Sequence, residues 1–361
     1  MEFEELKAQI NTERMIDSLQ KLIETPSVVG YGKEITPMLV DFAISHNLLY
    51  TMDRRRTIYL TITGLDPSHT ICFGAHLDTI GMVVRSITEE GWLDVRNLGG
   101  VNFHSLEGEN VTIHTRENGN YTGTVICKSH SVHVFDDARS RERDFAEMAV
   151  VLDEDVNSPE EVAELGIEPG DLISVDPRFV RTEAGYIKSR HIDDKACVAA
   201  LLEAVSVMQE AGLQPACDVM LAFPINEEIG QGGRFVPENV DAYIALDIGL
   251  VGGLQHGSEK KVTIGSADRI SPYDWDLTTK IRPIAKENQI DAVLDIYYRY
   301  ASDATAAMNG GANITAATFG MGTMSSHGYE RTHIDGIVNT AALALACMLE
   351  IDGDALDPQL G

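Results

Sequence analysis

Hydrophobic positions follow two periods along this chain, one typical of helices and one typical of buried strands. Apolar residues from Phe3 to Ile23 recur at helical spacing until Pro26, and a second helix is expected near Met38 to Ile44. In this larger part of the chain, strands are expected at 58–63, 71–75, 219–225, 243–246 and 314–319. Later helices are expected at about 195–212 and 337–349. After residue 188 strands and helices alternate, which predicts an α/β fold in which helices sandwich a mixed sheet.

Between residues 86 and 186 the pattern changes to short strands separated by turns. Strand candidates lie at 92–95, 111–115, 122–127 and 172–175. One helix interrupts them, because Ser158 is a capping residue, Pro159 takes the first helical position and Gly166 ends the helix. We therefore expect a main domain made of residues 1–85 and 187–361, with a small, mainly β domain of residues 86–186 inserted into it.

Composition restricts the class of protein. The 361 residues include 56 acidic and 28 basic side chains, a formal net charge of −28, and 44% of them are hydrophobic. An ordinary hydrophobic fraction indicates a globular protein, and the negative charge argues against nucleic acid as a partner. No apolar run approaches the roughly 20 residues that cross a bilayer, and the N-terminus is acidic, so we expect a cytoplasmic protein without a membrane partner. The five cysteines lack paired spacing, which predicts reduced thiols in the core.

Polar residues able to do chemistry stand directly after the predicted strands or before a helix. These residues are His76, Asp78, Asp193, Asp194, Glu227, Glu228, Asp247 and His327. In open α/β sheets ligands bind beyond the carboxyl ends of the strands, so these side chains are expected to converge on one edge of the sheet.

The set contains histidines and carboxylates but no cysteine, which suits one or two divalent ions such as Zn²⁺, Co²⁺ or Mn²⁺. Two ions about 3.5–4 Å apart need a bridging carboxylate. A further carboxylate, not bound to metal, must take the proton from water. The adjacent Glu227 and Glu228 suit this division, because neighbouring side chains at a strand end point in different directions.

Each of these residues also has an ordinary structural interpretation. Adjacent acidic residues are usually solvated surface, Asp193 and Asp194 could cap a helix, and Asp247 could cap a turn with Gly249. The combination of four strand ends and one helix start with a complete ligand set favours the metal site.

At these residues the chain resembles the tetrahedral-aminopeptidase and glutamyl-aminopeptidase family of co-catalytic metallopeptidases. The matching segments are GAHLDTIG at 74–81, LGIEPGD at 165–171, SRHIDDKA at 189–196, NEEIG at 226–230, ALDIG at 245–249, and SDA at 302–304 followed by His327. The resemblance covers nearly the whole chain. It implies a zinc-peptidase-like fold, two divalent ions per subunit, and an inserted domain that serves dimerisation, with dimers assembling into a dodecamer.

Carried over to this chain, the resemblance implies a role for each site residue. The implied metal ligands are His76, Asp193, Glu228, Asp247 and a late histidine. Asp193 would bridge the two ions, and its peptide bond to Asp194 would be cis, as in the family. Asp78 would orient His76, and Glu227 would be the general base.

The histidine that would be the last metal ligand in chain order lies where the chain departs from the family pattern. The family usually carries Arg-Tyr-x-His-Ser-Pro-x-Glu, whereas residues 324–333 read MSSHGYERTH. A gapless count from Asp303 puts the ligand at His327, which we favour, and His333 nearer the closing helix is the alternative. The changed loop lies beside the metals, so the substrate's preferred first residue stays open.

These features predict a dinuclear metal-dependent aminopeptidase that releases N-terminal residues from short peptides. A hydroxide bridging the ions would attack the peptide carbonyl, with Glu227 as general base. A related amide hydrolase, such as an N-acyl amino acid deacylase or dipeptidase, would use the same metals without requiring a free amine. A third hypothesis is a non-catalytic assembly protein, which would be expected to lack a ligand or the base.

Overall fold

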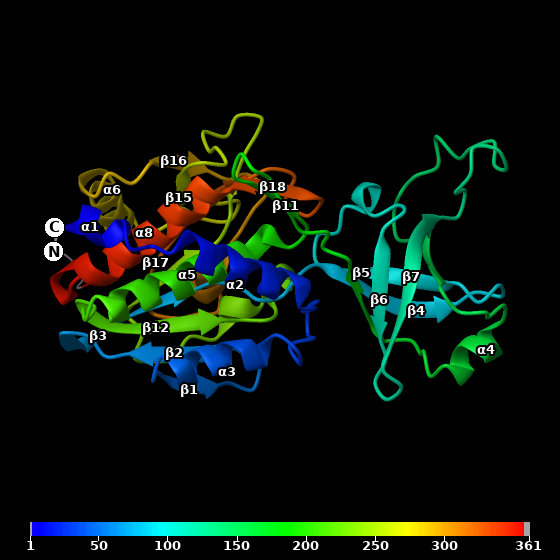
Figure 1. Ribbon diagram of the computed structural model, residues 1–361, viewed down its shortest axis with the longest axis horizontal. Helices are drawn as coiled ribbons and strands as arrows, with labels where there is room; N and C mark the ends of the chain where they lie inside the picture. The colour runs from blue at the N-terminus through cyan, green and yellow to red at the C-terminus, as the bar shows by residue number, and fades with distance from the viewer. Residues whose placement is uncertain (1, 357–361) are drawn as a thin grey trace.

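The computed structural model describes residues 2–356 and shows a large α/β domain beside a small β barrel (Figure 1). The strands of the large sheet are β1 (Leu49–Met52), β2 (Ile58–Ile62), β3 (Asp66–Gly74), β12 (Cys217–Phe223), β13 (Ala242–Leu246), β14 (Gly249–Leu250), β15 (Val262–Ala267), β16 (Ala292–Ile296) and β17 (Thr315–Thr323). They are ordered β1-β2-β12-β3-β13-β17-β15-β16, and β14 pairs with β17. Parallel and antiparallel pairs both occur, which confirms the predicted mixed sheet.

Four neighbouring strands in the middle of this sheet, β12, β3, β13 and β17, run parallel to one another. Nearly all their residues are buried toward the carboxyl ends, as expected for strands covered on both faces. Parallel strands end at the same edge of a sheet. The residues that follow these four strands are therefore brought side by side.

Helices cover both faces of the sheet. They are α1 (Phe3–Lys7), α2 (Thr12–Glu24), α3 (Thr36–Ser45), α5 (Ile192–Glu210), α6 (Trp275–Glu287), α7 (Asp303–Asn309) and α8 (Ile334–Glu350). Figure 1 shows α2, α5 and α8 across one face, and the largest hydrophobic cluster joins them to alternate strand residues such as Phe73 and Leu221. The intervening residues, such as Cys72 and Ala222, pack with Ala304 of α7 on the other face. No helix within residues 2–356 is long and apolar enough to cross a membrane.

The N-terminal pattern differs from the single helix expected between Phe3 and Ile23. The structure has two helices there, because Asn11 caps α2 and its side chain accepts a hydrogen bond from the Arg14 amide at 3.0 Å. Capping by a side chain of this kind favours a new helix start over a continuous helix. The edge strands β1 and β16 were not predicted, because their exposed positions leave no continuous apolar run.

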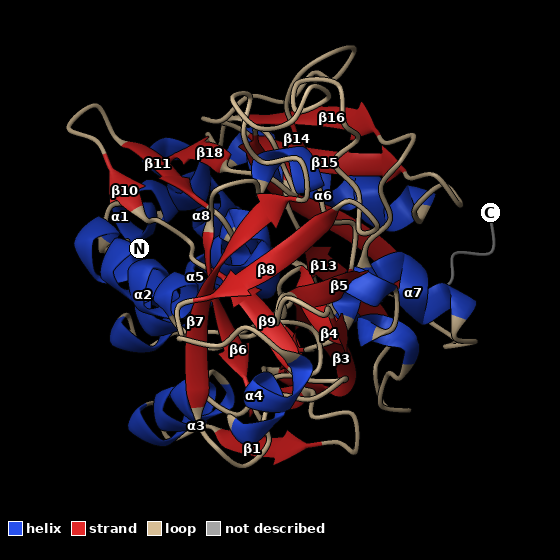
Figure 2. Cartoon of the chain, turned by 90° about the vertical axis from the view of Figure 1, so that its right-hand side faces the viewer, coloured by secondary structure: helices blue, strands red, loops and turns tan. Residues whose placement is uncertain are grey.

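The small domain is a closed barrel with its own hydrophobic core (Figure 2). Its strands are β4 (Gly81–Ile87), β5 (Leu93–Leu98), β6 (Asn110–His114), β7 (Asn120–Cys127), β8 (Met148–Leu152) and β9 (Leu172–Val175), with the short helix α4 (Pro159–Glu164) beside them. They close in the order β4-β5-β8-β7-β6-β9. Ser158 caps α4 by accepting from the Glu161 amide.

The strands of the barrel begin and end earlier in the chain than the range of residues 86–186 expected from the sequence pattern. The chain after it forms β10 (Val180–Arg181) and β11 (Tyr186–Ser189). Strand β11 pairs with β18 (Glu330–His333), so residues 180–189 belong to a separate three-stranded sheet. The pattern could not show this, because the pairing joins segments far apart in the chain.

The five cysteines all lie inside the two domains. Each of them is free and buried. Burial raises the pKa of the Cys217 thiol to about 11, which keeps it in the neutral form. The prediction of reduced thiols packed in the core is therefore confirmed.

Candidate active site

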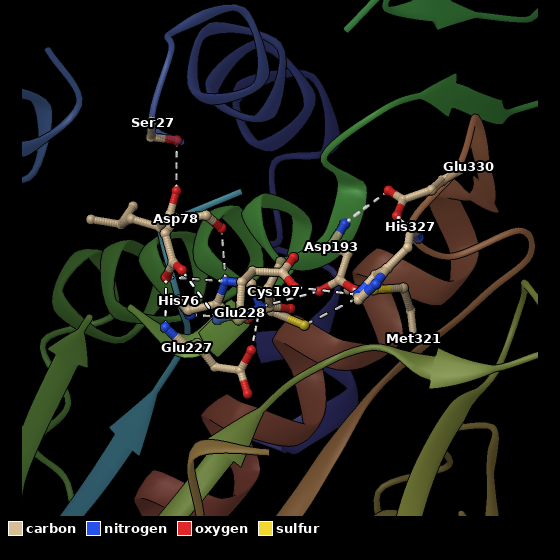
Figure 3. Close-up of polar contacts among 12 residues, drawn as sticks. Ser27, His76, Asp78, Asp193, Cys197, Glu227, Glu228, Met321, His327 and Glu330 are labelled. Atoms are coloured by element: carbon tan, nitrogen blue, oxygen red, sulfur yellow. Dashed lines mark hydrogen bonds and ion pairs between the residues drawn. The ribbon is translucent and has the colours of Figure 1, made fainter. Parts of the chain in front are cut away.

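The polar residues singled out in the sequence meet at the carboxyl edge of the four parallel strands (Figure 3). His76 and Asp78 follow β3, Asp247 follows β13, and Asp193 lies at the start of α5. Glu227 and Glu228 follow β12 in a short 3-10 helix, η2 (Glu227–Ile229). His327 stands in the loop after β17. The predicted convergence of strand ends thus describes the arrangement in space.

Two groups of three side chains are each able to hold one metal ion. The groups are His76, Asp193 and Asp247, and Asp193, Glu228 and His327, with the ligand atoms of each group within 4.8 Å of one another. Asp193 belongs to both groups. Its Oδ1 lies 3.2 Å from Nε2 of His76, and its Oδ2 lies 3.6 Å from Nε2 of His327. The two oxygens of one carboxylate therefore face different groups, which is the arrangement of a bridging ligand.

The hydrogen bonds of the two histidines leave a lone pair free for a metal in each ring. Nδ1 of His76 donates to the carbonyl oxygen of Asp78 at 2.9 Å, and Nδ1 of His327 donates to that of Gly100 at the same distance. A backbone carbonyl can only accept, so this pattern assigns the proton to Nδ1 and the lone pair to Nε2 in both rings. Each Nε2 points at Asp193.

The electrostatics of the buried carboxylates also fit divalent ions. Burial, followed by the charge of Asp193, raises the pKa of Asp247 to about 8 and that of Glu228 well above its usual range. Burial opposes protonation of His76, but the surrounding carboxylates outweigh it and raise the pKa of this imidazole. Crowded buried carboxylates are costly unless cations compensate them. Nitrogen and oxygen donors without thiolates suit Zn²⁺, Co²⁺ or Mn²⁺, so the residues fit two such ions.

Glu227 lies beside the two groups but belongs to neither. Its Oε2 is 3.7 Å from Nε2 of His76, and burial raises its pKa well above the usual range. The Asp78 carboxylate accepts from the backbone amides of Glu227 and Glu228 at 3.0 and 3.1 Å. Asp78 thus touches His76 mainly through its carbonyl oxygen, and its side chain holds the two glutamates in place.

The two candidate late histidines lie in different surroundings. His327 has a positive φ of 62°, and its Nε2 lies 3.3 Å from Oε2 of Glu228. In His333, Nδ1 accepts from the Asp335 amide and Nε2 donates to the Ala184 carbonyl, so both ring nitrogens are occupied. The geometry places His327 in the ligand group, whereas His333 caps α8.

The peptide bond between Asp193 and Asp194 is cis, as the resemblance implied. The Asp194 carboxylate accepts from the backbone amide of His76 at 3.2 Å. Asp194 therefore connects the start of α5 to the end of β3, rather than serving only as a helix cap.

Glu330 is a site residue that the sequence did not single out. It is buried, and its Oε1 accepts from the backbone amide of His327 while its Oε2 accepts from that of Asp193, each at 3.1 Å. One carboxylate thus fixes two members of the same ligand group. Its only signal in the sequence is its place three residues after His327.

Glu330→Gln should weaken metal binding without destroying the fold, because an amide replaces one of the two acceptor oxygens. Loss of a hydrogen bond that orients a ligand typically costs 10–100-fold in metal affinity. Competition with a chromophoric chelator measures this change. The control is Glu259→Gln, whose carboxylate binds Arg331 and should keep wild-type affinity. Equal affinities in all three proteins would contradict the assigned role of Glu330.

A cavity of about 850 Å³ opens beside the two ligand groups. Asp193, Asp247, Glu227 and Glu228 line it with their carboxylates. Its wall also holds residues of the loops after β15 and β16 and of α7, among them Arg269, Tyr300 and Thr305. Asp303 at the start of α7 is not part of this wall; its carboxylate accepts from the Gly233 amide at 2.6 Å, and burial raises its pKa to about 7.

This fold and site are those of a metallopeptidase. The chain belongs to the M42 glutamyl aminopeptidase family, whose profile matches residues 57–343. It is 36% identical over 332 residues to "Putative aminopeptidase YhfE" of Bacillus subtilis (strain 168), covering 91% of this chain and 96% of that protein. The resemblance noted in the sequence is thereby confirmed, and the protein is a peptidase.

Solved structures share the fold. The aminopeptidase APDkam598 from the archaeon Desulfurococcus kamchatkensis superposes with a TM-score of 0.86 at 22% identity, covering 97% of this chain and 98% of that one. The Pyrococcus horikoshii TET1 peptidase, described as assembling into a tetrahedron or a large octahedral shell, superposes with a TM-score of 0.81 at 24% identity, covering 93% and 99%. Both likenesses extend over the α/β domain and the barrel together.

Proposed function

We propose that this protein is a dinuclear metal-dependent aminopeptidase that releases N-terminal residues from short peptides. The observation that carries the proposal is Asp193, whose two carboxylate oxygens face two separate ligand groups beside the non-ligand Glu227. His76 and Asp247 would hold one ion, and Glu228 and His327 the other.

Divalent ions held by these residues would supply Lewis acidity, which would polarise the peptide carbonyl and lower the pKa of a bound water. Glu227 would accept the proton of the attacking water at its carboxylate and pass it to the departing amine. Asp78 would keep Glu227 and Glu228 in register through their backbone amides. The acidic lining would attract the substrate's ammonium group.

A paired assay tests this function. Short peptides with a free N-terminus are compared with their N-acetylated twins on metal-loaded protein, before and after chelation. Chelator-sensitive cleavage of the free-amine peptides alone is the expected result. Cleavage of the acetylated peptides would identify the N-acyl deacylase activity instead, and no cleavage of either by metal-loaded protein would favour a non-catalytic assembly.

We propose that the barrel serves dimerisation and that dimers assemble into a dodecamer. The support is the shared fold with Pyrococcus horikoshii TET1 and its described tetrahedral assembly. Light scattering on purified protein should then give a mass of about twelve subunits, and a monomer or dimer at micromolar concentration would contradict the proposed assembly.

The cavity wall bears on the substrate's first residue. Arg234, Arg269 and Arg299 line the cavity and are exposed. Within residues 2–356, Arg269 and Arg299 form no ion pair, although acidic residues outnumber basic ones two to one along the chain. Unpaired guanidinium groups favour a carboxylate partner. We propose that peptides with an N-terminal acidic residue are preferred substrates.

The double variant Arg269→Gln/Arg299→Gln should lose about tenfold of the preference for N-terminal Glu over Gln, since two partly solvated ion pairs contribute about 1–2 kcal/mol together. The ratio of kcat/KM for the two matched peptides measures it. Arg282→Gln, an exposed arginine on α6, is the control and should leave the ratio unchanged. If amidation of the peptide's C-terminus removes the arginine dependence, the wall recognises that carboxylate rather than the first side chain.

A further inference from the structure

Tyr300 lies in the loop between β16 and α7 and lines the same cavity as Asp247 and Glu227. Its backbone carbonyl accepts from the Arg269 amide at 3.1 Å, and its ring packs against Tyr297 with the centroids 4.7 Å apart. The position of the side chain is therefore fixed from two sides. Its hydroxyl is buried and has no hydrogen-bond partner anywhere in residues 2–356.

The other hydroxyl groups on this part of the wall are engaged. The Ser302 hydroxyl is bonded to the Tyr273 hydroxyl at 2.8 Å, and the Thr305 hydroxyl donates to the Asp268 carboxylate. These two hydroxyls tie α7 and its preceding loop to the segment after β15, which leaves them no free proton for a ligand. Among the three, Tyr300 alone has a donor to offer.

A buried hydroxyl without a partner destabilises the folded state, so a protein seldom keeps one without a use. The Tyr300 hydroxyl lies close enough to the Asp247 carboxylate to favour its ionised form, although it makes no full hydrogen bond with it. Around it the site offers carboxylates and the lone pairs of imidazoles, which are all acceptors. Apart from the exposed arginines of the wall, a group that gains negative charge during peptide hydrolysis would find few other donors there.

We propose that Tyr300 donates a hydrogen bond to the oxygen of the scissile peptide carbonyl as negative charge develops on it. The inference rests on the proposed aminopeptidase function and adds a catalytic residue to it. The phenol keeps its proton throughout, and no bond of the tyrosine is made or broken. The substrate's ammonium group is a donor itself and is matched by the carboxylates, so the carbonyl oxygen is the group that fits Tyr300.

Tyr300→Phe removes only the hydroxyl and tests the proposal. Loss of one donor to a developing oxyanion typically lowers kcat by about 10²–10³-fold. We expect that loss with little change in KM and with unchanged metal content and affinity. Tyr298→Phe is the matched control, because Tyr298 lies two residues away and its side chain is exposed. This variant should keep wild-type kcat. An unchanged kcat in Tyr300→Phe would overturn the proposal, while the wild-type activity on free-amine peptides would still support the enzyme's function.

A phosphinic dipeptide isostere, which carries a charged oxygen in place of the carbonyl, separates catalysis from positioning. Tyr300→Phe should weaken binding of this inhibitor by about the same factor as it lowers kcat/KM, and leave binding of the free amino acid product unchanged. If the variant instead loses metal ions in proportion to its activity, Tyr300 acts by positioning Asp247, and the proposed contact with substrate is wrong.

Discussion

Glu227→Gln should nearly abolish peptide cleavage in a protein that still binds its full complement of metal. Glu227 is absent from both ligand groups, so its replacement leaves the donor set intact. The amide cannot accept the proton of the attacking water, and loss of a general base typically costs about 10²–10⁴-fold in kcat. The Asp78 carboxylate bonds the backbone amide at this position, so the loop should keep its conformation. Steady-state kinetics and elemental analysis of the same sample measure both quantities.

The neighbouring Glu228→Gln is the matched control, because it makes the same chemical change one residue along the chain. Glu228 is a member of the group with His327, so this variant should lose activity together with metal affinity. The metal content of the two variants, rather than their rates, then distinguishes the role of Glu227 from that of Glu228. If Glu227→Gln cleaves peptides at the wild-type rate, the base must be sought elsewhere. If it loses metal, Glu227 is a ligand.

The parts of the fold that could be predicted are those that carry a local pattern. Strand β13 and the carboxyl-terminal parts of β3 and β12 are apolar runs because both faces are covered, and α5 and α8 have apolar residues at helical spacing. The edge strand β16 lacks such a run, and the proline inside α6 interrupts its helical pattern. The pairing of β11 with β18 depends on contacts between distant segments, which no local pattern contains.

The site could be predicted where chemistry coincides with a strand end. His76, Asp247 and the two glutamates follow parallel strands that end at one edge, so their type and position in the chain were informative together. Glu330 bonds the backbone amide of the distant Asp193, and Tyr300 reaches the cavity from the loop before α7; neither follows a predicted apolar strand. The choice between His327 and His333 also needed structure, because it depends on which ring keeps a nitrogen lone pair.

The barrel contributes directly to the candidate metal site of the larger domain. Gly100, just after β5, accepts the Nδ1 proton of His327 through its carbonyl oxygen. A Cβ at this position would lie 2.7 Å from Nδ1, so only glycine lets the backbone approach the ring this closely. The tautomer of His327, one of the proposed metal ligands, is thus set by the inserted domain, which links the folding of the barrel to the chemistry of the site.

Asp193→Ala should remove both metal ions, whereas variants of the other ligands should remove only one. Without Asp193, each group keeps only two donors. Both groups also lose the negative charge of the carboxylate that they share. Cleavage should fall by about 10³-fold or more, since metal catalysis contributes several kcal/mol. Elemental analysis at limiting metal gives the number of ions bound per subunit.

The single-group variants make this a test of bridging rather than of ligation alone. Asp247→Ala changes only the group with His76, and His327→Ala changes only the group with Glu228, so each should retain one ion. His333→Ala should retain both, because its ring nitrogens are already bonded to Asp335 and Ala184. Metal ions stabilise a fold that binds them by about 4 kcal/mol at a thousandfold excess over Kd, so added metal should raise the Tm of every variant except Asp193→Ala. One ion retained by Asp193→Ala would mean that Asp193 serves a single ion, and the two groups would then act independently.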